Sequence, residues 1–125
     1  MTVDYCRLND IRIQAYSPLR SSGSGVARFP NLLNPPPEGA PDVKQAVQLL
    51  ADLARKYEGT PASIMLAWLL RHPAGIIPII GASNPEHIVE CCVANRIELT
   101  RVEWYSLLAI GGTCSTLRPC GTREL

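Results

Sequence analysis

Eleven prolines within 125 residues decide where the helices of this chain can begin and end. A proline is tolerated in the first turn of a helix, where its missing N–H is not needed, but it breaks a helix interior. Pro61 and Pro85 each follow a residue that can cap a helix, Thr60 and Asn84. The sequence therefore predicts helices that begin at these two prolines, and Pro73 closes the first of them.

Apolar periodicity and capping residues predict three further helices. Residues 2–9 read as the tail of a helix. Asp42 is placed to cap a second helix, which Gly59 stops. Thr100-x-x-Glu103 is a capping box, and it predicts a last helix that ends at Gly111–Gly112.

Two short segments have the patterns of β-strands. Residues 11–16 alternate, with Ile11, Ile13 and Ala15 on one face. The run from Gly75 to Ile80 is continuously apolar, which is typical of a strand buried on both faces, and its Pro78 removes one ladder hydrogen bond. Because helices separate the two strands, we expect them to be parallel and adjacent in an α/β arrangement with open edges.

The stretch from Arg20 to Pro41 is rich in Ser, Gly, Pro and Asn, and is predicted to be a long loop. The end of the chain has no apolar period. The sequence thus divides into a folded part over residues 1–112 and an irregular tail over residues 113–125.

Charge and composition exclude several classes of partner. Twelve Lys and Arg oppose 11 Asp and Glu, so no basic field attracts nucleic acid or an anionic membrane surface. The longest strongly apolar stretch, residues 64–70, is far shorter than the about 20 residues of a membrane span. Five cysteines without metal-ligand spacing favour free thiols, and with them a cytoplasmic setting.

Ligands of α/β folds bind at the carboxyl ends of parallel strands, here residues 16–19 and 81–87. Gly81 would let a ligand approach the backbone closely. Ser83, Asn84 and the N–H groups of the following helix are suited to an anion. The alternative is that Asn84 only caps its own helix and Gly81 only makes a turn.

Several motifs in sequence resemble the C-terminal portion of an aldo-keto reductase, over about residues 3–110. They are Asp4–Arg7, Gln14–Leu19, Thr60–Ala62, Leu66–Pro73, Ile77–Ser83 and Leu99–Thr100. The resemblance implies the C-terminal part of a (β/α)8 TIM barrel, with two parallel strands and flanking helices. It also implies NADP(H) bound in an extended pose and reduction of aldehydes or ketones by hydride transfer.

The same resemblance assigns cofactor contacts to both strand ends. Tyr16 would stack on the nicotinamide ring, and Ser17 and Leu19 would line the pyrophosphate. The adenosine ribose and its 2′-phosphate would meet Gly81, Ala82, Ser83 and Asn84. His87 stands where many members have an arginine that binds this phosphate. Because an imidazole lacks the guanidinium fork, the preference for NADP over NAD would be weakened.

No catalytic residue is assigned in this chain. The family uses an Asp, a Tyr, a Lys and a His from the N-terminal half of its barrel, and we find none of those motifs here. We therefore expect a fragment of an NAD(P)H-dependent reductase that binds NADP(H) weakly or not at all alone, and a carbonyl substrate only when completed by the missing half.

Two other readings remain open. In one, the chain is a non-catalytic interaction module whose Ile76–Ile80 strand pairs with a barrel partner or with itself through open strand edges. In the other, it is a degenerate reading frame without function.

Overall fold

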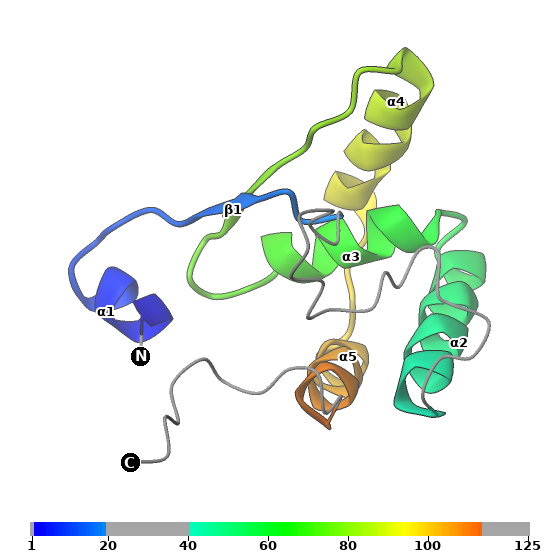
Figure 1. Cartoon of the computed structure of the whole chain (residues 1–125), viewed down its shortest axis with the longest axis horizontal. Helices are drawn as coiled ribbons and strands as arrows, with labels where there is room; N and C mark the ends of the chain where they lie inside the picture. Colours follow the sequence, from blue (N-terminus) through cyan, green and yellow to red (C-terminus); the bar gives the residue numbers. More distant parts are fainter. Residues whose placement is uncertain (1, 20–40, 114–125) are drawn as a thin grey trace, which may run out of the picture.

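The computed structural model describes residues 2–19 and 41–113. In chain order the elements are α1 (Thr2–Leu8), β1 (Gln14–Tyr16), α2 (Pro41–Lys56), α3 (Pro61–Leu70), β2 (Ile77–Ile79), α4 (Pro85–Val93), the 3₁₀ turn η1 (Ala94–Arg96) and α5 (Arg101–Thr113) (Figure 1). This order is the predicted one. The predicted loop, up to residue 40, and the tail from residue 114 lie outside the described residues.

The two strands form a parallel sheet in which Ala15 lies opposite Pro78. The N–H of Ile77 donates to the carbonyl oxygen of Ile13 at 2.9 Å. Because N–H groups of successive strand residues point to opposite sides, the nitrogen of Pro78 faces away from β1. The donor that proline lacks is therefore missing on the open edge of β2, and the pairing of the two strands keeps its hydrogen bonds.

Both strands are shorter and more exposed than predicted. The strand expected at residues 11–16 spans only Gln14–Tyr16, and β2 is also three residues long. Of the three residues predicted to share one face, Ile13 and Ala15 are half-buried, whereas Ile11 is exposed. The prediction that the apolar run ending at Ile80 is buried on both faces is wrong, because Ile77, Ile79 and Ile80 each keep more than a third of their surface exposed. A strand with one neighbour has too few partners to cover it.

The buried core lies around α3, which contacts α2, α4, η1 and β2, whereas α1 lies at the far end of the molecule from α2 (Figure 1). Ile64 of α3 is fully buried at its centre. The other core residues are Leu50, Leu53, Ala54, Leu66, Ala67, Ala94, Ile97 and Leu99. This core is built almost entirely from helices and the turn after α4, so the sheet contributes little to it.

Side-chain caps begin α3 and α4 as predicted. The Thr60 hydroxyl accepts from the N–H of Ser63, whose own hydroxyl accepts from the N–H of Thr60. Asn84 accepts from the N–H of Glu86 at 3.0 Å. The expected cap at Asp42 is wrong, because α2 begins at Pro41 and Asp42 lies inside its first turn.

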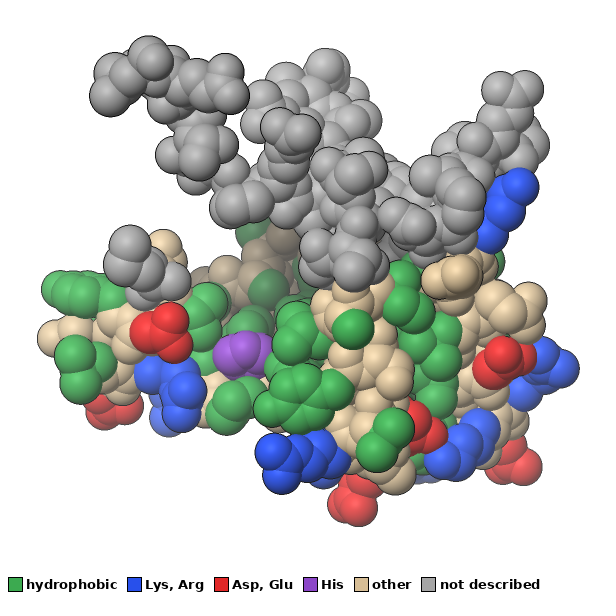
Figure 2. Space-filling model, turned by 90° about the horizontal axis from the view of Figure 1, so that it is seen from below, with side chains coloured by type: hydrophobic (Ala, Val, Ile, Leu, Met, Phe, Trp, Pro, Cys, Tyr) green, Lys and Arg blue, Asp and Glu red, His purple; other side chains and the backbone are tan. Residues whose placement is uncertain are grey.

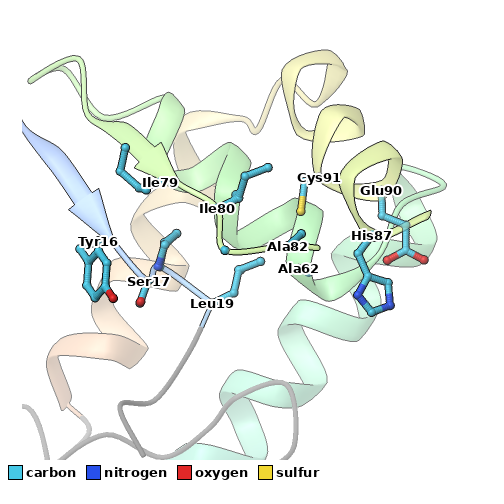
Figure 3. A pocket seen from close by; sticks show the side chains of 12 residues that line it. Tyr16, Ser17, Leu19, Ala62, Ile79, Ile80, Ala82, His87, Glu90 and Cys91 are labelled. Atoms are coloured by element: carbon cyan, nitrogen blue, oxygen red, sulfur yellow. The ribbon is translucent and has the colours of Figure 1, made fainter. Parts of the chain in front are cut away.

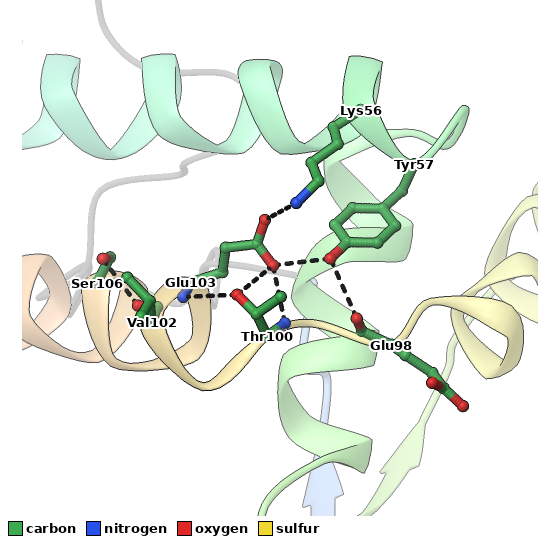
Figure 4. A network of polar contacts seen from close by, with 7 residues as sticks. All are labelled: Lys56, Tyr57, Glu98, Thr100, Val102, Glu103 and Ser106. Atoms are coloured by element: carbon green, nitrogen blue, oxygen red, sulfur yellow. Dashed lines mark hydrogen bonds and ion pairs between the residues drawn. The ribbon is translucent and has the colours of Figure 1, made fainter.

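The capping box of α5 is present, and it is extended into a link with α2 (Figure 4). Glu103 Oε2 accepts from the N–H of Thr100 at 2.8 Å and lies 2.7 Å from the hydroxyl of Tyr57, while Oε1 lies 2.6 Å from Lys56 Nζ. Burial raises the pKa of Glu103, but hydrogen bonds from Lys56, Tyr57 and Thr100 outweigh it and lower the pKa to about 2. The helix continues to residue 113, slightly beyond the predicted end at Gly111–Gly112.

Charges of both signs are interspersed on the face seen in Figure 2, with apolar side chains between them. No helix in the described ranges is long and apolar enough to cross a membrane. Within the same ranges, no group of three His, Cys, Asp or Glu side chains is placed to hold a metal ion.

Candidate cofactor site

A pocket of about 400 Å³ lies where the two strands end. Its volume is within the range of small-molecule sites, roughly 300–1,000 Å³. Six of the eight residues proposed from the sequence line it, namely Tyr16, Ser17, Leu19, Gly81, Ala82 and His87. The parallel register carries the two groups to the same edge, since Tyr16 lies opposite Ile79. Contact of these residues with a cofactor stays a prediction.

The pocket is polar at its ends and apolar between them (Figure 3). Tyr16 and Ser17 lie at one end, and His87 and Glu90 extend from α4 at the other. The stretch between them is lined by Leu19, Ala62, Ile80, Ala82 and Cys91. Such an arrangement suits an elongated ligand with a polar group at each end.

Ser17 has a left-handed backbone conformation, with φ of 49°. For a residue other than glycine this conformation costs free energy, and such residues concentrate at ligand sites. Here it turns the chain directly after β1, so that Tyr16, Ser17 and Leu19 all line the pocket within four residues.

At Gly81 an added Cβ would meet no atom within 4 Å, and the backbone does not adopt a positive φ. The protein itself therefore does not require glycine at this position. Open space beside its backbone would allow a ligand to approach closely, and contact of Gly81 with a ligand stays a prediction.

The predicted anion site at the start of α4 is smaller than expected. Pro85 has no N–H, that of Glu86 donates to the Asn84 side chain, and that of Ile88 donates to the Asn84 carbonyl at 3.2 Å. Ser83 and Asn84 are both exposed and neither lines the pocket. The Asn84 side chain therefore caps its own helix, as the alternative interpretation of the sequence expected.

Sequence reasoning missed several lining residues, of which Glu90 and Cys91 are the polar ones. Glu90 follows His87 by three residues on a helix, and that spacing places both side chains on the same face. The signal was therefore present once the helix had been recognised. Ala62 could not be found in this way, because it comes from α3, a different part of the chain.

Burial raises the pKa of the Cys91 thiol, and the neighbouring Cys92 and Glu90 add to this increase. The thiol is therefore protonated at neutral pH and is not activated as a nucleophile. It lines the pocket as a small, weakly polar group.

Tyr57 is a tyrosine with a lysine beside it, since Lys56 Nζ lies 5.1 Å from its ring centroid. This pair does not form a proton donor of the kind the family uses. Its hydroxyl contacts Glu103, it does not line the pocket, and burial followed by the Glu103 contact raises its pKa rather than lowering it. No catalytic residue is thus assigned among the described residues.

The arrangement of helices and parallel strands is that of part of a TIM barrel. A thermostable aldo-keto reductase solved in complex with the inhibitor epalrestat matches 87% of this chain with a TM-score of 0.66 and 28% identity, and the match covers 33% of that structure. The family model described as "Aldo/keto reductase family" matches residues 1–110. This chain belongs to the aldo/keto reductase family.

Two curated relatives are 6-dehydroglucose reductases. The one from Agrobacterium fabrum is 44% identical over 59 residues, which cover 45% of this chain and 20% of the relative. The one from Novosphingobium aromaticivorans is 34% identical over 65 residues, which cover 51% of this chain and 21% of the relative. The matched segments thus span about a fifth of the length of these relatives.

Proposed function

We propose that this chain supplies part of the cofactor site of an NAD(P)H-dependent aldo-keto reductase, which reduces aldehydes or ketones by hydride transfer. The observation that carries the proposal is the pocket that joins the ends of β1 and β2. Tyr16 and His87 lie at opposite ends of this pocket, and an extended dinucleotide would have its nicotinamide ring at Tyr16 and its adenosine end at His87. A bound NAD(P)H would supply the hydride.

In this proposal the chain contributes binding but not the proton donor. Tyr16 offers a largely exposed ring on which a planar group can stack, and Ser17 and Leu19 continue the contact toward the middle of the ligand. The groups that bind and protonate the carbonyl substrate would belong to a second polypeptide segment that completes the barrel. A cytoplasmic setting stays a prediction from the sequence.

Saturation-transfer NMR with NADP⁺ and the purified full chain tests the cofactor site, because it detects millimolar binding. We expect weak binding, since an incomplete barrel is poorly preorganised. Tyr16→Ala should weaken it about threefold to tenfold, the loss expected for one aromatic stack. The chain alone should not oxidise NADPH in the presence of an aldehyde.

Tyr105→Ala is the matched control for this test. Tyr105 is also an exposed aromatic residue, but it belongs to α5 and does not line the pocket. Its replacement should leave binding unchanged. Absence of any signal at millimolar NADP⁺ would contradict the proposed site, and so would equal losses in the two variants.

The open edge of β2 supports a second candidate function, that of a module that associates with itself or with a barrel partner. β2 pairs only with β1 among the described residues, and its isoleucines are exposed. Such an edge is a template for a further strand. Sedimentation over a hundredfold range of chain concentration tests the self-association, and a monomer at every concentration would rule against it.

A further inference from the structure

His72 joins the end of α3 to the turn that leads into β2. Its backbone N–H donates to the carbonyl oxygen of Leu69, and its own carbonyl oxygen accepts from the N–H of Gly75, both at 3.0 Å. Gly75 has a φ of 60°, a left-handed conformation two residues before the first residue of β2. A change in the hydrogen bonds of the His72 side chain would therefore act directly on the turn that begins this strand.

The imidazole ring of His72 accepts a hydrogen bond inside this turn. The backbone N–H of Ala74 donates to His72 Nδ1 at 3.1 Å. A ring nitrogen that accepts carries no proton, so the neutral ring holds its proton on Nε2. A proton on Nδ1 would set two donors against each other. Only the neutral ring can therefore make this contact.

The same ring also contacts Trp104 of α5. The two ring centroids lie 5.8 Å apart, with an interplanar angle of 51°. A cation within about 6 Å of an indole ring can gain a cation–π attraction that a neutral ring lacks. Trp104 is itself held in place by its stacked contact with Trp68. The aromatic contact thus persists in the protonated ring, whereas the bond from Ala74 requires the neutral one.

The ionisable groups on the elements around this ring do not neutralise it. Arg71 precedes His72 and is exposed. On α5, Arg101 lies over the Tyr105 ring, and Glu103 is held by its contacts with α2. No carboxylate of the described residues forms an ion pair with His72. The imidazolium therefore has an aromatic ring as its partner, and not a carboxylate.

We propose that His72 is a pH-sensitive switch in the turn between α3 and β2. The neutral ring holds the N–H of Ala74, and the imidazolium releases that N–H while it stays against Trp104. Histidine is the side chain whose charge ordinarily changes between about pH 5 and 8. The proposal concerns the turn and not the pocket, so it goes beyond the proposed function and does not depend on it.

Proton–nitrogen NMR spectra of the full chain from pH 8 to pH 5 test the switch, because the chemical shift of the Ala74 amide proton reports its hydrogen bond. This proton should move upfield as the pH falls, with the same midpoint as the ring protons of His72. Its protection factor for hydrogen exchange should fall at least about fivefold, as expected for the loss of one hydrogen bond. The pH range ends above that in which Glu103 titrates, since the pKa of Glu103 is about 2.

His72→Asn separates the switch from other effects of acid. An asparagine side chain accepts from the N–H two residues ahead and takes up no proton in this range, so the Ala74 amide should stay hydrogen-bonded at both ends of the titration. His87→Asn is the matched control, because the chain has two histidines and His87 lies on α4. In this variant Ala74 should titrate as in the unchanged chain. An Ala74 amide that does not follow the His72 ring overturns the proposal, and so does a titration of Ala74 that survives His72→Asn.

Discussion

Trp68 and Trp104 stack with ring centroids 5.2 Å apart and an interplanar angle of 12°, and each indole N–H donates to the backbone carbonyl of the other residue, at 3.1 and 3.0 Å. The pair thus joins α3 to α5 by two hydrogen bonds and one stacked contact. Neither helix belongs to the two-stranded sheet, so this contact joins them independently of strand pairing.

Trp104→Phe should destabilise the chain by about 1 to 3 kcal/mol, because it removes one N–H donor, leaves the Trp68 carbonyl without its partner and reduces the stacked area. Urea unfolding followed by circular dichroism measures the change. Tyr105→Phe is the control, since it keeps the ring that packs edge-on against Trp104. Equal effects of the two substitutions would show that the reciprocal hydrogen bonds contribute little.

Glu103 should make the free energy of unfolding of the chain depend on pH in the acidic range. Its pKa is lowered from 4.5 to about 2 in the folded chain, so its contribution is complete above about pH 4.5 and is lost as the pH falls toward 2. Glu103→Gln should cost about 2 kcal/mol at pH 7 and less at pH 3. Urea midpoints measured from pH 7 to pH 3 test this.

Glu98→Gln is the control for the acid dependence, because only the backbone carbonyl of Glu98 contacts Tyr57 and its side chain is exposed. This variant should follow the unchanged chain over the whole pH range. If Glu103→Gln also loses as much stability between pH 7 and pH 3 as the unchanged chain does, another group is responsible.

Gly59→Ala should destabilise the start of α3. The added Cβ would lie 2.6 Å from Ser63 Oγ, and that hydroxyl is held by hydrogen bonds with the backbone of Thr60. Ser63 is fully buried, so it has little room to move. We expect a loss of about 1 to 2 kcal/mol, measured by thermal unfolding. Gly81→Ala, whose Cβ meets open space, should leave the stability unchanged.

Local signals in the sequence predicted the helix starts well. Thr60 and Asn84 cap helices through atoms only two or three residues away, so their sequence context contains the whole interaction. Exposure of Ile79 could not be predicted in the same way, because burial of a strand depends on neighbours that are distant in sequence. A continuous apolar run is typical of a strand covered on both faces, and β2 is not covered in this way.

The same distinction applies to the candidate site. Tyr16 and Gly81 could be proposed because strand ends meet in any parallel sheet. That Ala62 joins the lining from α3 could not be predicted, because it depends on packing between segments distant in sequence.

Ser17→Gly should stabilise the turn after β1 by about 0.5 to 1 kcal/mol, because glycine adopts a φ of 49° without the steric cost that serine incurs. Ser17→Val should destabilise it, since a β-branched side chain is poorly accommodated in this conformation. Thermal unfolding of the two variants in parallel checks the opposite signs. A loss of stability in Ser17→Gly would mean that the hydroxyl contributes more than the backbone strain costs.

Ile77→Lys should weaken self-association of the chain at least about tenfold, because it places a charge on an exposed residue of the strand whose edge is open. Ile77 lies outside the pocket lining, so cofactor binding should persist in this variant. Val102→Lys, on the exposed surface of α5, is the control and should associate like the unchanged chain. Sedimentation of all three proteins at matched concentrations measures the difference, and equal association of the two lysine variants would place the contact elsewhere than β2.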